Sequence, residues 1–151
     1  MIRDIIHVGL TVSDLDRSVA FYRDVLGFAY QGELYMDGET TAKMFAKPGC
    51  TARVGYLKAG TDNIQGPPVE LIQFTSHTPD KKPTDLFTTS ISEICFESND
   101  IWADYERLKA KGVEFLSEPQ EFDFTADGFG KSCAVYLRDP DGLILELMQA
   151  R

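Results

Sequence analysis

Four polar side chains interrupt segments of this sequence that are otherwise apolar and β-rich: His7, Glu70, Glu93 and Glu146. Glu70 and Glu146 hold the same place in two matching segments, which both read apolar residue, Glu, two apolar residues, Gln. A carboxylate between apolar neighbours is costly to bury unless a cation or several hydrogen-bond donors compensate its charge. One imidazole and three carboxylates suit a divalent ion such as Mn²⁺, Fe²⁺, Co²⁺, Ni²⁺, Mg²⁺ or Zn²⁺. The pattern therefore predicts a metal site built from these four residues.

Each of the four residues also has an ordinary structural interpretation. A single histidine in a strand is often a hydrogen-bonded core residue, and strand glutamates often lie at a sheet edge or pair with Arg or Lys. Symmetry favours the metal, because His7 and Glu93 hold matching positions in two further segments. For Glu93 three roles stay open: a metal ligand, a carboxylate that assists the ligands or the chemistry, and a surface residue on a strand shifted by one position.

The elements that must position these residues form an internal repeat. Residues 5–12 and 91–98 are β-rich, and each is followed by an aspartate that can cap a helix, Asp14 or Asp100. The apolar residues that then recur at helical spacing are Leu15, Val19, Tyr22 and Leu26 in the first copy and Ile101, Tyr105 and Leu108 in the second. The sequence therefore predicts a strand followed by a helix in each half of the chain.

The rest of each repeat reads as three strands. A glycine ends each predicted helix, Gly27 or Gly112, and a new strand is predicted to begin there. The second half closes with a hairpin at the tight-turn sequence Asp-Pro-Asp-Gly of residues 139–142. Residues 53–58 and 69–73 form the matching pair of strands in the first half. Each half is thus predicted to be a βαβββ module of an α+β protein.

Neither predicted module can bury both faces of its sheet alone, so we expect the whole chain, 1–151, to form a single domain. The modules are expected at residues 1–75 and 91–151, joined by a polar, proline-containing linker at 76–90. Residues 32–52 are expected to hold a short helix or an irregular flap. Residues 117–132 are expected to form a long aromatic loop, a kind of segment that often acts as a lid.

Composition excludes several classes of partner. The formal net charge is −9 and the pI about 4.6, which is the wrong sign for binding nucleic acid or an anionic membrane. The sequence has neither a run of about 20 apolar residues nor the start of a signal peptide, so we expect a cytoplasmic protein. Its three cysteines, Cys50, Cys95 and Cys133, are too few and too far apart for a disulfide framework, and we expect reduced, mostly buried thiols.

Several motifs together carry a family resemblance. They are His7, the segment Asp-x-x-x-Ser-x-x-Phe-Tyr-x-x-x-Leu-Gly-Phe at 14–28, Val-Glu-Leu at 69–71, Asp-Pro-Asp-Gly at 139–142 and Leu-Glu-Leu at 145–147. The chain thereby resembles the vicinal oxygen chelate superfamily, which includes glyoxalase I, methylmalonyl-CoA epimerase, fosfomycin-resistance enzymes, extradiol dioxygenases and bleomycin-resistance proteins. The resemblance covers nearly the whole chain and is specific for the fold, not for the reaction.

The resemblance implies paired βαβββ modules that form one cupped, mostly antiparallel sheet, with helices on the outside, around a divalent metal with open coordination positions. Carried over position by position, the ligands are His7 and Glu70 from the first module and Glu93 and Glu146 from the second. Glu93 departs from the family pattern, in which metal-binding members commonly have a histidine. This departure counts against the two-histidine, one-carboxylate sites of extradiol dioxygenases and fosfomycin-type transferases.

The resemblance further implies a metal-dependent lyase or an epimerase or isomerase that binds an oxygenated small molecule and stabilises an enediolate-type oxyanion. Glu146 or Glu93 is then the expected base. The alternatives are a dioxygenase with a non-standard ligand set, a member that keeps only part of the ligand set, and a metal-free resistance protein that binds a drug or other small molecule. In that last alternative, Tyr56, Phe122, Phe124 and Phe129 offer stacking surface. A homodimer is expected in each case.

Overall fold

The computed structural model of the chain describes residues 3–60, 66–80 and 84–151. They form two compact units, Met1–Lys81 and Lys82–Arg151. None of the helices in the described ranges is long and apolar enough to cross a membrane.

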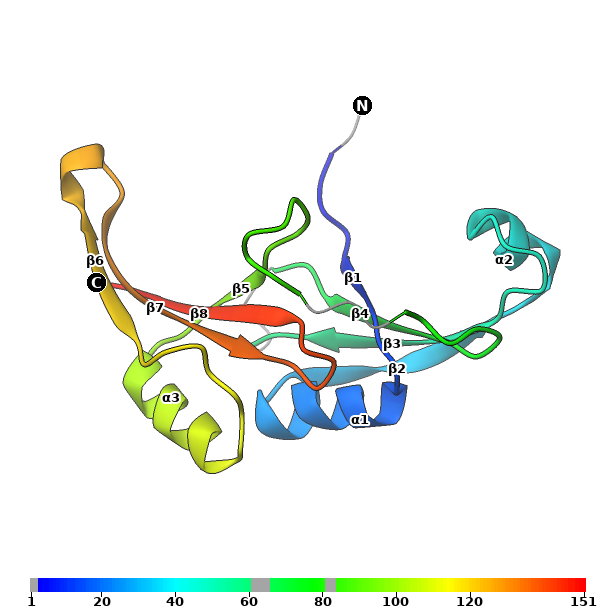
Figure 1. The fold of residues 1–151 in the computed structure, drawn as a ribbon, viewed down its shortest axis with the longest axis horizontal. Coiled ribbons are helices and arrows are strands. Elements are labelled where there is room, and N and C mark those ends of the chain that lie inside the picture. The colour runs from blue at the N-terminus through cyan, green and yellow to red at the C-terminus, as the bar shows by residue number, and fades with distance from the viewer. Residues whose placement is uncertain (1–2, 61–65, 81–83) are drawn as a thin grey trace. The chain divides into compact units, whose positions relative to one another are not determined.

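The first unit contains one four-stranded sheet with the strand order β1-β4-β3-β2 (Figure 1). Strands β1 and β4 are parallel, and the other neighbouring pairs are antiparallel. Its elements are β1 (Val8–Thr11), α1 (Leu15–Ala20), a π-helical segment (Phe21–Val25), β2 (Ala29–Met36), α2 (Gly38–Met44), β3 (Ala52–Lys58) and β4 (Val69–Phe74). Residues 32–52 therefore hold the end of a strand and the short helix that was one of the two expectations for them.

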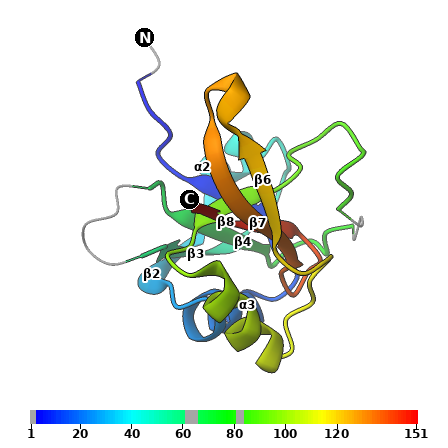
Figure 2. The same ribbon diagram turned by 90° about the vertical axis from the view of Figure 1, so that its left-hand side faces the viewer.

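The second unit repeats this topology with the strand order β5-β8-β7-β6. Strands β6 and β7 run side by side to a short 3-10 turn (Figure 2). The elements are β5 (Ile94–Glu97), α3 (Ile101–Ala110), β6 (Gln120–Phe124), the 3-10 turn (Thr125–Asp127), β7 (Gly130–Arg138) and β8 (Ile144–Ala150). The predicted α+β class and the two βαβββ modules are confirmed, and hydrogen bonding divides the strands into two sheets of four.

Each unit begins its first helix with the same set of caps. The carboxylate of Asp14 accepts a hydrogen bond from the Arg17 amide at 3.0 Å, and Asp100 accepts one from the Ala103 amide at 3.1 Å. These bonds satisfy amides that have no partner within a first helical turn. The π-helical segment ends before Gly27, which adopts a φ of 87° that favours glycine.

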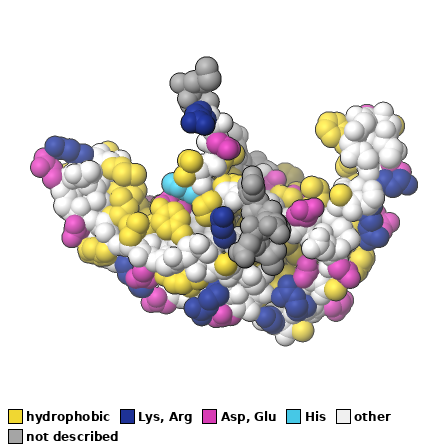
Figure 3. All heavy atoms as spheres, turned by 180° about the vertical axis from the view of Figure 1, so that it is seen from behind, with side chains coloured by type: hydrophobic (Ala, Val, Ile, Leu, Met, Phe, Trp, Pro, Cys, Tyr) yellow, Lys and Arg dark blue, Asp and Glu magenta, His cyan; other side chains and the backbone are white. Residues whose placement is uncertain are grey.

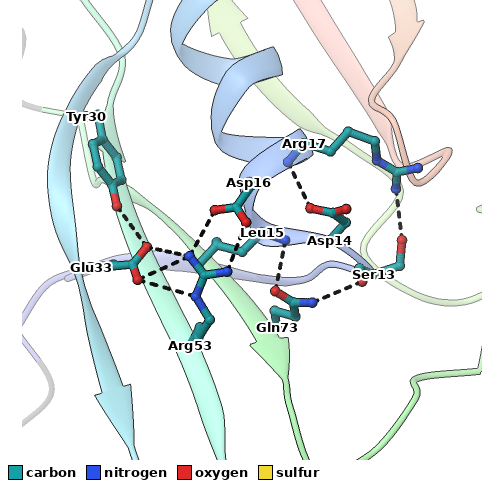
Figure 4. A network of polar contacts seen from close by, with 9 residues as sticks. All are labelled: Ser13, Asp14, Leu15, Asp16, Arg17, Tyr30, Glu33, Arg53 and Gln73. Carbon is teal, nitrogen blue, oxygen red and sulfur yellow. Dashed lines mark hydrogen bonds and ion pairs between the residues drawn. The ribbon is translucent and has the colours of Figure 1, made fainter.

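A glutamine from the last strand of each unit completes these helix starts. Figure 4 shows the one in the first unit, Gln73. The Gln73 side chain accepts a hydrogen bond from the Leu15 amide at 3.1 Å and donates one to the Ser13 carbonyl at 3.4 Å. In the second unit, Gln149 accepts from the Ile101 amide at 3.2 Å and donates to the Asn99 carbonyl at 2.7 Å. The repeated Gln of the sequence thus ties each helix to the strand that carries the repeated Glu.

Helices α1 and α3 each pack on one face of the sheet in their unit and thereby build the cores. Leu15, Val19 and Tyr22 are buried on α1 and its π-helical extension, as predicted. Gly55 of β3 permits this close packing, because a Cβ there would lie 3.2 Å from Leu15 Cδ1. In the second unit the buried residues of α3 are Ile101, Tyr105 and Leu108, also as predicted. Since neighbouring strand residues point to opposite faces, Glu70 and Glu146 lie on the face away from the helices.

The first strand of each unit is shorter than predicted. β1 begins at Val8 and β5 at Ile94, so His7 and Glu93 precede their strands instead of lying inside them. In the first unit the reason is the neighbouring strand. Val8 is opposite Val69, and the next residue along that partner, Pro68, has no N–H with which to continue the ladder.

Two other predictions in the second half are wrong. Residues 112–115 do not begin a strand, because Phe115 forms only an isolated bridge with Leu137 before Pro119 interrupts the pairing. Residues 117–132 are not a long loop, since they contain β6, the 3-10 turn and the start of β7. The aromatic residues of this segment alternate with acidic ones, which is the pattern of a strand with two different faces.

Candidate functional site

His7, Glu70 and Tyr56 form a polar cluster on the face of the first sheet opposite α1. His7 Nε2 lies 3.2 Å from Glu70 Oε2, and the Tyr56 hydroxyl donates a short hydrogen bond to Glu70 Oε1. The side chain of Glu70 is only 12% exposed, whereas that of His7 is 40% exposed. One carboxylate oxygen is therefore fixed by the phenol, and the other faces an imidazole that solvent can reach.

The strands around Glu70 explain this arrangement. In the sheet register, Glu70 of β4 is opposite Tyr56 of β3 on one side and Gly9 of β1 on the other. A Cβ on Gly9 would lie 3.2 Å from Glu70 Oε2, so the glycine leaves room for that oxygen to approach His7. The hydrogen bond to Glu70, together with burial and the negative charge of the carboxylate, raises the pKa of Tyr56 to about 12. Tyr56 thus remains a hydrogen-bond donor at neutral pH.

The donor atoms of His7 and Glu70 fit a divalent ion. Two ligand atoms that lie about 2.1 Å from one ion, with about 100° between them, are about 3.2 Å apart. This is the separation of His7 Nε2 and Glu70 Oε2. A hydrogen bond from Tyr56 to the other oxygen would orient the carboxylate in the way that neighbours of metal ligands commonly do.

Glu146 holds the corresponding position in the second sheet. It lies opposite Tyr136 of β7 and Cys95 of β5, as Glu70 lies opposite Tyr56 and Gly9. Cys95 is exposed as a residue, but desolvation of its thiol, a hydrogen bond to Glu146 and the charges of Glu146 and Glu93 raise its pKa to about 12. Burial, followed by the charges of Glu146, Glu93 and Cys95, likewise raises the pKa of Tyr136. Both neighbours therefore stay protonated beside the carboxylate at neutral pH.

Of the four predicted site residues, the structure brings His7 and Glu70 into contact in the first unit. In the second unit, the charges of Glu146 and Glu93 both act on Cys95 and Tyr136. Within the part of the chain that is described, no three His, Cys, Asp or Glu side chains are grouped so as to hold a metal ion. The four-residue metal set stays a prediction.

Sequence reasoning missed the neighbours of the two glutamates. The sequence indicates Tyr56 only as stacking surface and does not by pattern alone link Tyr136 or Cys95 to Glu146. The predicted hairpin already contains the information for Tyr136. Counting residue pairs outward from the turn at 139–142 places Tyr136 opposite Glu146. The prediction of reduced, mostly buried thiols is confirmed: the three cysteines are free, Cys50 and Cys133 are buried, and Cys95 is exposed on β5, a strand at the edge of its sheet.

Comparison with known proteins identifies several relatives. A family model for the Glyoxalase/Bleomycin resistance protein/Dioxygenase superfamily matches residues 4–147. A "Probable lactoylglutathione lyase" of Vibrio parahaemolyticus is 30% identical over 145 residues, which cover 96% of this chain and 89% of that protein. A protein of the same name from Synechocystis is 27% identical over 146 residues, covering 96% and 94%.

Solved structures show the same fold at lower sequence identity. A glyoxalase family protein from Bacillus cereus superposes with a TM-score of 0.82 at 18% identity, covering 99% of this chain and 95% of that one. The trypanothione-dependent glyoxalase I of Leishmania major superposes with a TM-score of 0.67 at 21% identity, covering 97% and 86%.

Proposed function

The chain belongs to the glyoxalase/bleomycin resistance protein/dioxygenase superfamily, and from this premise we propose that it is a divalent-metal-dependent lyase or isomerase. The observation that carries the proposal is the contact between His7 and the buried Glu70, whose donor atoms have the spacing of neighbouring ligands. Glu70 is buried while His7 is partly exposed, so an ion bound between them would be held by the protein on one side and open to a substrate on the other. The name of two relatives, "Probable lactoylglutathione lyase", favours a lyase acting on an α-oxygenated carbonyl compound.

His7, Glu70 and Glu146 are proposed as ligands, with Glu93 as a further ligand or a base. When bound, the ion would polarise oxygen atoms of the substrate as a Lewis acid. Tyr56 holds one oxygen of Glu70 and thereby fixes the direction of the other. Glu146, which is hydrogen-bonded by the Cys95 thiol, is the proposed acceptor of the proton next to the substrate carbonyl. Glu93 is the second candidate for that step.

Metal content tests the proposal directly. The protein would be purified without chelator, reconstituted with each candidate ion and measured by elemental mass spectrometry. We expect about one ion per chain, at least a tenfold weaker affinity in His7→Ala and Glu70→Gln, and a similar loss in Glu146→Gln. His77→Ala is the matched control, because His77 is the other histidine and its ring contacts Ser76 at 2.6 Å.

Activity of the loaded protein would then be screened on hemithioacetals, acyl-CoA epimers and diols. Glu146→Gln is expected to abolish turnover while the fold persists, and turnover like that of the wild type would refute its role. Failure to bind any ion after reconstitution would favour the second candidate function, a metal-free small-molecule-binding protein. The specific observation in favour of that function is a pair of exposed, stacked phenylalanines on β6.

A further inference from the structure

A tyrosine holds the carboxylate of Glu70 in the first unit. Glu70 of β4 lies opposite Tyr56 of β3 on one side and Gly9 of β1 on the other. Glycine has no side chain that could donate a hydrogen bond, whereas the Tyr56 hydroxyl donates one to Glu70 Oε1. Of the two residues that flank Glu70 within the sheet, the tyrosine is therefore the one that orients it.

A cysteine has this role in the second unit. Glu146 of β8 lies opposite Tyr136 of β7 and Cys95 of β5, so the three side chains share one face of the sheet. The hydrogen bond to Glu146 comes from the Cys95 thiol, which stands where the first unit has a glycine. The charge of Glu146 also acts on Tyr136, but these two side chains, both within the described ranges, form no hydrogen bond. The second unit thus keeps the tyrosine and exchanges the donor.

The hydroxyl of Tyr136 is left without a protein partner. Within the described part of the chain, no group forms a hydrogen bond with it. The hydroxyl is also open to solvent, because the one buried side-chain oxygen or nitrogen that lacks a partner among these residues is the hydroxyl of Ser18. Partial burial, followed by the charges of Glu146, Glu93 and Cys95, raises the pKa of Tyr136. The phenol is therefore a free hydrogen-bond donor at neutral pH.

Tyr136 and Glu146 can contact the same small molecule. Opposite residues of neighbouring antiparallel strands have Cβ atoms about 4.5–5.5 Å apart, and these two side chains lie on one face. In the proposed reaction, Glu146 accepts a proton from the carbon next to a carbonyl, and negative charge then develops on the carbonyl oxygen. A hydroxyl beside the base can donate a hydrogen bond to that oxygen. Because the phenol keeps its own proton, it stabilises charge and does not transfer a proton.

We propose that Cys95 positions Glu146 and thereby leaves the Tyr136 hydroxyl to donate a hydrogen bond to an oxygen atom of the substrate. This role rests on the proposed function, because the oxygen belongs to the carbonyl compound on which Glu146 acts. The two matching tyrosines then have different tasks, since Tyr56 orients a carboxylate and Tyr136 contacts the substrate. Cys95 is a positioning residue, because it acts through Glu146. The exchange of Gly9 for Cys95 between the units is the difference that permits this division.

The same substitution at the two tyrosines separates their tasks. Affinity for Mn²⁺ would be measured by equilibrium dialysis and elemental mass spectrometry, because Mn²⁺ favours oxygen ligands over thiolates. Tyr56→Phe removes the donor to a proposed ligand and should weaken Mn²⁺ binding by about tenfold. Tyr136→Phe removes a hydroxyl that orients no ligand, so Mn²⁺ affinity should change by less than about threefold. An equal loss of affinity in both variants would overturn the inference.

Variants at Cys95 test whether its thiol orients Glu146. Cys95→Ala removes the donor and should weaken Mn²⁺ binding by about five- to tenfold, whereas Cys95→Ser keeps a donor and should stay within about threefold of the wild type. Cys133→Ala is the matched control, since Cys133 is a buried thiol of β7 on the face opposite Tyr136. This control should lower stability but leave the Mn²⁺ affinity of the folded protein unchanged. A loss of affinity as large as that of Cys95→Ala would reveal a merely structural effect and contradict the positioning role.

Tyrosine labelled with ¹³C at Cζ reports the state of the hydroxyl without any metal. The NMR signal of Tyr136 is assigned by its loss in Tyr136→Phe. In metal-free Cys95→Ala, Glu146 has lost its thiol donor, so we expect the Tyr136 hydroxyl to bond to it and the signal to move. Cys95→Ser should leave the signal at its wild-type position. A signal that does not move in Cys95→Ala would mean that the thiol is not what keeps Tyr136 from bonding to Glu146, and the inference would fail.

Turnover tests the contact with the substrate. In the metal-loaded protein, with whichever of the screened compounds reacts, Tyr136→Phe should lower kcat by at least about tenfold and change KM by less than about threefold. The reason is that the hydrogen bond reaches its full strength only as charge develops on the oxygen. Tyr30→Phe is the matched control and should keep the wild-type kcat. The Tyr30 hydroxyl also donates to a glutamate, Glu33, but its ring lies beside Gly55 on the face of the first sheet that α1 covers.

The outcomes distinguish this inference from the proposed function. If Mn²⁺ binds and turnover is found but Tyr136→Phe keeps the wild-type kcat, the proposed function stands and the inference fails. If no ion binds and no compound reacts, the proposed function fails, and the contact between Tyr136 and a substrate fails with it. In that case the NMR signal of metal-free Cys95→Ala still decides whether the thiol keeps the Tyr136 hydroxyl free of Glu146.

Discussion

At the scale of single residues, the carboxylate of Glu70 depends on the hydroxyl of Tyr56. Glu70 is buried, and Tyr56 and His7 are the groups that meet its two oxygens. Removing a hydrogen-bond donor from a buried charged group leaves that group both desolvated and unpaired. The cost is larger than for the same change at the surface, because water replaces a lost partner only where water has access.

We expect Tyr56→Phe to lower the free energy of unfolding of the metal-free protein by about 1–2 kcal/mol, measured by urea denaturation in the presence of a chelator. The matched control is Tyr30→Phe, because the Tyr30 hydroxyl also donates to a glutamate, Glu33 at 3.2 Å, but at an exposed site. Its effect should stay below about 0.5 kcal/mol. Equal losses of unfolding free energy in the two variants would mean that burial of Glu70 does not strengthen the contribution of its hydrogen bond with Tyr56.

Arg53 links α1 to β2 by contacts with two carboxylates (Figure 4). Its guanidinium lies 2.9 Å from Asp16 and 3.0 Å from Glu33. The hydrogen bond and the positive charge of Arg53 lower the pKa of Asp16. Since the folded pKa lies below the unfolded value, the pair stabilises the native state above that value, and the contribution is lost as the pH falls through the folded pKa.

In Arg53→Gln we therefore expect the pKa of Asp16 to rise toward its ordinary value in an NMR titration. The difference in unfolding free energy between wild type and variant should be present at about pH 6 and should disappear by about pH 2. Arg23→Gln is the control, because Arg23 pairs with its neighbour Asp24 at 2.6 Å, and adjacent residues meet in the unfolded chain too. A difference for Arg53→Gln that does not change with pH would contradict this account.

At the scale of elements, the two capping glutamines join each helix to the strand that carries a candidate ligand. Gln73 and Gln149 each satisfy one amide and one carbonyl at a helix start. We expect Gln73→Ala and Gln149→Ala each to lower the free energy of unfolding by about 1–2 kcal/mol in urea denaturation. Gln31→Ala should cost less than about 0.5 kcal/mol, because Gln31 is exposed and makes one bond, to the Ala29 carbonyl at 3.3 Å. A similar loss of unfolding free energy in all three variants would mean that the two capping glutamines stabilise the fold no more than an exposed glutamine does.

Local signals predicted most of these elements. Asp14 and Asp100 cap helices where expected, and the Asp-Pro-Asp-Gly turn joins β7 to β8. Such features depend on residues next to one another in sequence, so the chemistry of a short segment is sufficient to predict them. The repeat then predicted that both halves share one topology, because equal patterns bury equal faces.

The errors arose where a partner strand decides the outcome. His7 is not inside β1, because Pro68 ends the neighbouring ladder, and Pro119 separates residues 112–115 from β6. Neither interruption can be seen until the strand register is known. For the site, the sequence predicted four residues converging on one metal ion, and the structure shows the contact between two of them, His7 and Glu70. The sequence could not predict the donors, Tyr56 and the Cys95 thiol, which reach the glutamates across the sheet.

At the scale of the whole molecule, the surface combines acidic charge with exposed apolar side chains. Lys and Arg number 15 against 24 Asp and Glu, which keeps copies of the chain apart at long range. Large apolar residues are nevertheless exposed before the first strand of each unit, in Ile5, Ile6, Phe87 and Ile91. Figure 3 also shows hydrophobic side chains among charged ones on the surface drawn there. Exposed apolar residues of this number favour contact with another protein surface at short range.

We predict that these exposed residues contact a second copy of the chain, in keeping with the homodimer that the family resemblance implies. Light scattering should give twice the 16.9 kDa of one chain at micromolar concentrations. Ile5→Ser/Ile6→Ser should raise the dissociation constant at least about tenfold, because two apolar side chains would lose their burial.

Met44→Ser is the matched control, since Met44 is exposed on α2, away from these segments in sequence. A monomeric mass at about 100 µM would refute the dimer, and an equal effect of Met44→Ser would move the interface to α2. Because charge repulsion opposes this association, the dimer should strengthen as salt is added up to about 0.5 M.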